Sequence, residues 1–287
     1  MARIQADIDD LAFDLYGFSE ADRAAVCQSN PGDSGGDDDL EIDEEEEDIQ
    51  EDTPADHQTS LLSWAVGVAF GRFDWRLATG EREAPPEPDP FDPLPAKSPG
   101  MLPDDAHPFH VHTGILVDDL GHPHDLVHLI EEVLERVDMP VPNDVRQWLQ
   151  KDFFPFHLKT YSKSRRKTPI YWPLSTPSGS YTLWIYYPGL TSQTLYSAIN
   201  DFLEGPRGKL KQVGDEVASL RMKGSGRSHE DEKQFEKYQA LELELIELRD
   251  TLLDIARNFH PNQDDGVQMI TAAPLWKLFQ HRPWQNV

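Results

Sequence analysis

Apolar residues recur at helical spacing along much of the chain, and this pattern predicts a mainly helical protein. In the segment 124–137 the apolar residues Leu126, Leu129, Ile130, Val133 and Leu134 share one helical face. Comparable patterns predict helices at 3–18, 19–25, 61–73, 143–151 and 191–203. Between 205 and 260, two longer heptad-like segments flank the flexible sequence KGSGRS, which predicts an antiparallel helical hairpin.

Fewer segments have the β-branched and aromatic composition of strands. A short strand is expected at 114–118, and two more at 170–172 and 181–187 should form a hairpin. The turn between them, TPSGS, has Pro177 to fix one dihedral angle and Gly179 to accept a positive φ. The predicted fold class is therefore α+β, mostly helical with a small β-hairpin or sheet element.

Composition divides the chain into five parts. Residues 33–56 contain 14 Asp or Glu and no Lys or Arg, so like charges repel and little apolar surface offsets the chain entropy. The predicted parts are an N-terminal helical segment (1–27), a disordered acidic linker (28–58), a mixed α/β recognition-type domain (59–204), the helical hairpin (205–260) and a C-terminal segment packing on the core (261–287).

The formal net charge of −26 argues against a general nucleic-acid binder, but the charge is unevenly spread. No Asp or Glu occurs at 153–200, and this stretch contains Lys159, Lys163, Arg165, Arg166 and Lys167 among many aromatic residues. Basic groups neutralise phosphates and aromatic rings stack on bases, so a DNA contact surface is one interpretation. The alternative is a solvated basic turn that leads into an ordinary buried hairpin.

Other features of the sequence limit the kinds of site and location that the protein can have. A single cysteine, Cys27, excludes an intrachain disulfide and a Cys-based zinc site, and it suits a reducing cytoplasm. The longest apolar run, 61–70, is too short to span a bilayer, so no membrane association is expected. Six histidines between His107 and His128 have spacings compatible with a metal site, with Asp118 or Asp119 as an oxygen ligand, but glycine and proline interrupt them, and no metal is assigned.

Catalytic motifs are absent from the sequence. An amino-methyltransferase needs a glycine-rich loop for S-adenosylmethionine and an Asp/Asn-Pro-Pro-aromatic motif, and the chain has neither. Phosphate-loop, nucleophile-elbow and zinc-protease motifs are also missing. No catalytic or cofactor-binding residue is therefore assigned to this chain.

Several segments, in order, resemble the C-terminal region of large adenine-specific DNA methyltransferases of the type IIG restriction-modification and BREX phage-defence families. They include IDDLAFDLYGF, LLSWAVGVAFGRFDWRLATGER, YSKSRRKTPIYWPLSTPSGSYTLWIYY and DDGVQMITAAPLWKLFQHRPWQ. The resemblance covers nearly the whole chain and is weakest in the acidic linker.

The resemblance implies a target-recognition and spacer region that works on double-stranded DNA. It implies S-adenosylmethionine for a full-length enzyme or a catalytic partner chain, with none bound by this chain. Phosphate contacts are then expected from Lys159, Lys163, Arg165, Arg166 and Lys167. Ser178 and Ser180, around Gly179, are expected to let the backbone approach DNA.

The chain departs from the family pattern at His124 and in HPNQDDG, and it starts after the catalytic core. We therefore expect a gene fragment, a split-gene product or a separately encoded specificity part. Two alternatives to DNA recognition stay open: a protein-interaction module built on the helical hairpin and acidic linker, and a non-functional remnant.

Overall fold

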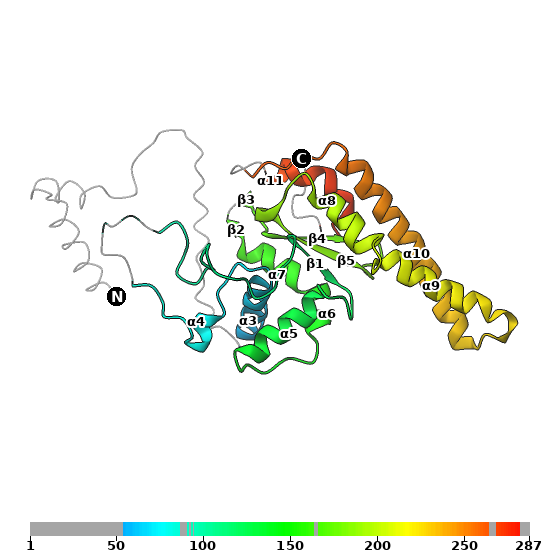
Figure 1. Ribbon diagram of the computed structural model, residues 1–287, viewed down its shortest axis with the longest axis horizontal. Coiled ribbons are helices and arrows are strands. Elements are labelled where there is room, and N and C mark those ends of the chain that lie inside the picture. The colour runs from blue at the N-terminus through cyan, green and yellow to red at the C-terminus, as the bar shows by residue number, and fades with distance from the viewer. Residues whose placement is uncertain are drawn as a thin grey trace, which may run out of the picture. The chain divides into compact units, whose positions relative to one another are not determined.

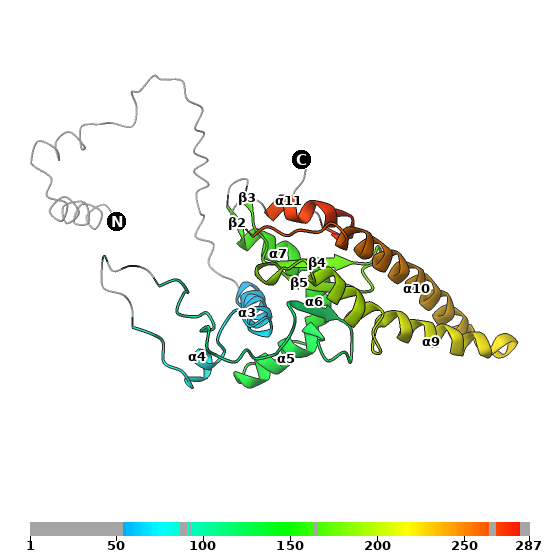
Figure 2. The ribbon, with the colours of Figure 1, turned by 45° about the horizontal axis from the view of Figure 1, so that its top comes forward.

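A three-stranded antiparallel sheet lies between two groups of helices (Figures 1 and 2). The computed structural model describes residues 54–86, 91, 93, 95–163, 166–263 and 268–281, which belong to one compact unit. This architecture confirms the α+β class. The predicted helices at 3–18 and 19–25, and most of the acidic linker, fall outside the described residues. Within the described part of the chain, no helix is long and apolar enough to cross a bilayer.

The sheet has the strand order β1-β5-β4. Ile115 of β1 pairs with Ile185 of β5, and Tyr171 of β4 pairs with Tyr186 of β5. The β4–β5 turn contains Gly179 with φ +72°, as its sequence predicts. The strands are β1 (Ile115–Asp118), β4 (Tyr171–Ser175) and β5 (Thr182–Tyr186), so the predicted strand and hairpin are confirmed.

Aromatic side chains bind one face of the sheet to the first group of helices. The Tyr171 ring stacks on Phe70 with a centroid distance of 4.8 Å, and Trp184 lies 5.2 Å from Phe153. Alternate residues of a strand share a face, so these contacts all come from one side of the sheet. The helices on this side are α3 (Pro54–Ala69), α5 (Leu126–Arg136), α6 (Val145–Lys151) and α7 (Phe153–Thr160), with a short α4 (Arg76–Thr79) after α3.

The opposite face is covered by the C-terminal part of the chain. Trp172, fully buried, stacks on Tyr187 at 4.9 Å and contacts Phe279 at 6.0 Å. This layer contains η1 (Tyr187–Gly189), α8 (Thr194–Ser197), η2 (Ala198–Leu203), α9 (Lys209–Met222), η3 (Gly224–Gly226), α10 (His229–Ala256), α11 (Gln268–Ala272) and η4 (Ala273–Leu278).

The helical hairpin is confirmed as α9 packed on α10. Ser228 begins α10 with a capping box, because its hydroxyl accepts from the Asp231 backbone N–H while the Asp231 carboxylate accepts from the Ser228 N–H. Leu241, Leu245 and Leu248 form part of the buried seam. These buried leucines join the same core as the sheet, so the hairpin is anchored at its base.

Some predicted helix bounds differ from the structure. The helix predicted at 61–73 is α3, which ends at Ala69, before Gly71 with φ +67°. The Phe73 ring beyond this end folds against Gly67 and would lie 2.2 Å from a Cβ added there. The helix predicted at 143–151 begins at Val145, and the first helix of the hairpin begins at Lys209.

The described part of the C-terminal segment contacts the core through Phe279, which is buried, and Trp276, which is half-buried. Residues 264–267 and 282–287 of the predicted segment lie outside the described residues.

Candidate nucleic-acid interface

The predicted basic residues lie on the last turn of α7 and on a small separate hairpin. Strands β2 (Ser162–Lys163) and β3 (Arg166–Lys167) pair so that Lys163 is opposite Arg166. Lys159 is exposed on α7, and Lys167 is half-buried. Arg165 lies outside the described residues. Lys159 is thus near the end of α7, three residues before the first strand of the basic hairpin.

Helix α7, which the periodicity did not predict, holds this hairpin in place. Its buried His157 accepts hydrogen bonds through Nε2 from the backbone N–H groups of Ile170 (2.8 Å) and Tyr171 (3.3 Å). The carbonyl of Tyr161 accepts from the Thr168 N–H at 3.0 Å, and the Ser162 hydroxyl donates to the Leu158 carbonyl. The base of the hairpin is thus fixed to both α7 and the start of β4.

One basic residue beside this hairpin was missed by the sequence analysis. Arg72 follows α3, and its Nη1 donates to the Tyr161 hydroxyl at 2.5 Å. The contact joins residues 89 positions apart, and no local pattern in AFGRF signals it.

The predicted turn contacts, Ser178 and Ser180, lie at the other end of β4. Five residues of strand separate them from β3, which corresponds to about 16 Å. The Ser178 hydroxyl donates to Glu244 of α10 (2.6 Å), and the hydroxyls of Ser178 and Ser180 are 2.8 Å apart. A carboxylate at this point repels phosphate, so the turn and the basic hairpin do not form one continuous surface.

Four of the six histidines, His110, His112, His122 and His124, lie on the loops before and after β1, whereas His128 lies on α5. The Nε2 of His110 lies 2.7 Å from the Nδ1 of His124, and the Nδ1 atoms of His112 and His122 accept backbone N–H groups. Burial lowers the pKa of all four imidazoles, that of His112 to about 4. These contacts favour neutral rings.

The two candidate oxygen ligands for a metal are occupied by cations. Asp118 binds Arg146, and Asp119 binds Lys209. No group of three or more His, Cys, Asp or Glu residues converges as a metal site in the described part of the chain.

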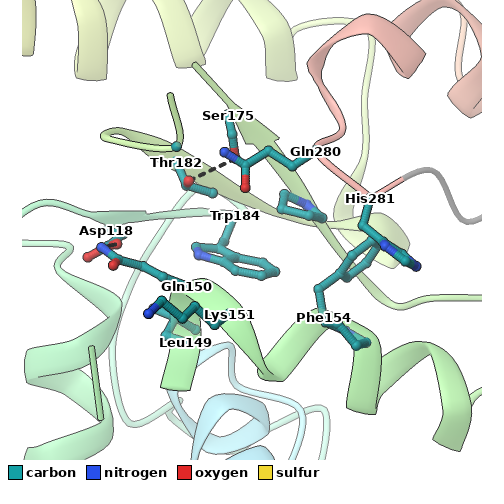
Figure 3. A pocket seen from close by; sticks show the side chains of 13 residues that line it. Asp118, Leu149, Gln150, Lys151, Phe154, Ser175, Thr182, Trp184, Gln280 and His281 are labelled. Carbon is teal, nitrogen blue, oxygen red and sulfur yellow. Dashed lines mark hydrogen bonds between the residues drawn. The ribbon is translucent and has the colours of Figure 1, made fainter. Parts of the chain in front are cut away.

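A cavity of about 160 Å³ lies beside the β4–β5 turn (Figure 3). Two pairs of its polar lining groups bond to each other: Ser175 with Thr182 at 2.8 Å, and Gln150 with Asp118 at 2.6 Å. None of the predicted basic residues lines it. The cavity is therefore separate from the candidate interface.

Comparisons with models of known protein families and with curated proteins find no match to this chain.

Proposed function

We propose that this chain is the DNA-recognition and scaffold portion of a site-specific adenine-N6 DNA methyltransferase system. It acts with a catalytic chain that supplies S-adenosylmethionine binding and methyl transfer. The observation that carries the proposal is the cluster of basic residues formed by Lys159 and the β2–β3 hairpin, which lies in a stretch of the chain without acidic residues.

In this proposal the basic hairpin contacts phosphates of double-stranded DNA. Such contacts position a protein on the duplex, whereas sequence is read by other groups at the base edges. The hairpin is well suited to this role because its base is held in place. The Tyr161 carbonyl accepts from the Thr168 N–H, and the His157 side chain of α7 accepts from the backbone N–H groups of Ile170 and Tyr171 at the start of β4. The α9–α10 hairpin serves as the scaffold. The Ser178 hydroxyl donates to Glu244, and this bond holds the β4–β5 turn against α10.

Salt-dependent binding to a short duplex tests the DNA contacts. Each phosphate contact contributes about 0.9 to the slope of log K against log salt concentration. The triple variant Lys163→Gln, Arg165→Gln, Arg166→Gln is therefore expected to reduce the slope by about 2–3. Fluorescence anisotropy at a series of salt concentrations measures it.

The matched control removes the same charge elsewhere. Lys211, Lys233 and Lys237 are exposed on the α9–α10 hairpin, and their triple replacement by glutamine should leave the slope close to wild type. Equal slopes for wild type and both variants would show that the basic hairpin does not contact DNA. Loss of duplex binding with retained capture of a catalytic chain would favour a protein-interaction module.

The methyltransferase assignment has its own test. The purified chain, incubated with labelled S-adenosylmethionine and duplex DNA, is expected to transfer no methyl group. Transfer is expected after addition of a neighbouring-gene product that carries the Asp/Asn-Pro-Pro-aromatic motif. Transfer by this chain alone would contradict the division of roles between two chains.

A further inference from the structure

The cavity beside the β4–β5 turn has the size and the walls of a site for one small ring. Its volume of about 160 Å³ is close to that of an engineered cavity in another protein, about 150 Å³, that binds benzene. The Phe154 and Trp184 rings line it with an angle of 64° between their planes, and Pro155 and Pro173 add apolar surface. A single six-membered ring therefore fits this volume, whereas the fused rings of a purine would extend beyond it.

Polar groups in the same cavity match the edge of a heterocyclic ring. The exposed Gln280 side chain lies beside the Ser175–Thr182 pair (Figure 3). Its only hydrogen bond in the described part of the chain is a weak one, from Nε2 to the Thr176 carbonyl at 3.5 Å, so the amide can still donate and accept. The Ser175 and Thr182 hydroxyls, 2.8 Å apart, use one proton between them and keep a second. The cavity can thus pair with a ring edge that carries both donors and acceptors.

The open side of the cavity is basic. Lys151 lines it from the end of α6, is exposed, and makes no ion pair with any described residue. His281, also exposed, lines the same side of Phe154 as a second potential donor. Asp118 lines the cavity too, but its carboxylate is 4% exposed and is bound by Arg146. An anionic group attached to the ring is therefore favoured near Lys151.

We propose that this cavity binds a pyrimidine nucleotide, with the base between the apolar walls, its edge at Gln280 and its phosphate at Lys151. A pyrimidine base is a single ring whose edge has donors and acceptors, and the phosphate supplies the anion. Inorganic phosphate alone would leave the apolar walls unused. The same chemistry is offered by a free nucleotide and by an unstacked nucleotide of DNA. The DNA source rests on the proposed function, whereas the free nucleotide does not.

Thermal melting of the full chain with small probes tests the site. Thymidine monophosphate should raise the melting temperature more than adenosine monophosphate, thymidine or inorganic phosphate does at equal concentration and ionic strength. Lys151→Gln should weaken thymidine monophosphate about tenfold, as expected for one lost hydrogen bond to a charged group, and leave thymidine unchanged. Gln280→Leu should weaken both probes. Lys211→Gln, an exposed change on α9 away from the cavity, is the matched control and should affect neither.

Two oligonucleotides separate the sources. If DNA supplies the nucleotide, single-stranded oligo(dT) should bind more tightly than oligo(dA), and Gln280→Leu should remove the difference. Equal binding of the two strands, together with a thymidine monophosphate effect that Lys151→Gln weakens, assigns the site to a free nucleotide.

Three outcomes would overturn the inference. They are no effect of thymidine monophosphate on wild type, an equal effect of adenosine monophosphate or inorganic phosphate, and an undiminished effect in both Lys151→Gln and Gln280→Leu. Both variants change exposed side chains and are expected to fold. The proposed function is judged separately, by the salt slope of the triple hairpin variant. An unchanged slope there, with thymidine monophosphate still bound, would keep the cavity site and reject the DNA-recognition role.

Discussion

Replacing Arg146 by alanine should lower the free energy of unfolding by about 3 kcal/mol, within the range for breaking a buried ion pair. The guanidinium binds Asp118, and its Nη2 donates to Asp125 at 2.6 Å. These two aspartate side chains are 4% and 1% exposed, so the variant leaves two buried carboxylates without their cation. Arg146 itself is 31% exposed, which places the expected loss at the low end of that range. Urea denaturation at neutral pH measures it.

Arg249→Ala provides the control for Arg146. Its guanidinium pairs with Glu204 and Asp250 at the surface, where loss of an ion pair costs about 0–1 kcal/mol. Burial raises the pKa of Asp125, although the hydrogen bond and the charge of Arg146 lower it. The stability lost in Arg146→Ala should therefore shrink as the pH falls, because the Asp125 carboxylate becomes protonated. Equal losses for the two arginine variants would show that the buried network is not the source of the effect.

His157→Leu is expected to cost about 2–6 kcal/mol, because one buried and one part-buried backbone N–H group lose their acceptor at about 1–3 kcal/mol each. Those groups belong to Ile170 and Tyr171, at the junction between the basic hairpin and β4. His157→Gln should be milder, since its amide oxygen can accept in place of Nε2. Thermal or urea unfolding of the two variants compares them directly.

The same residue predicts a pH dependence of stability. Burial, with a smaller effect of Arg72, lowers the pKa of His157 to about 3. The unfolded state therefore binds the proton first, near pH 6.5, and stability falls as the pH drops from there toward 3. The slope from this group approaches about 1.4 kcal/mol per pH unit. His157→Gln should have a shallower slope between pH 6.5 and 5 than wild type, and parallel curves would contradict the assignment.

Sequence pattern predicted those elements whose signal is local. The apolar face of α5 repeats at helical spacing, and the β4–β5 hairpin has a turn with Gly179 at the position of positive φ. Helix α7 was missed because FFPFHLKT is apolar on several sides and has Pro155 in its first turn, so no single face stands out.

The candidate site was less predictable because its contacts join distant positions. The sequence identified Lys159 and the basic hairpin, since charge clustering is visible along the chain. It could not show that Arg72 meets Tyr161, or that Glu244 reaches Ser178 from 66 positions away. Only the packing of α3 and α10 around the sheet creates these pairs.

The central position of β5 has a consequence for synthesis of the chain. Ile115 in β1 must wait for Ile185 to emerge before it has a partner, and at about 5–20 residues per second this takes several seconds. During that interval α3 and α5 have already been synthesised, whereas β5, which completes their core, has not yet emerged from the ribosome. The nascent chain thus passes through a stage in which those apolar faces have no sheet to pack on and are open to aggregation.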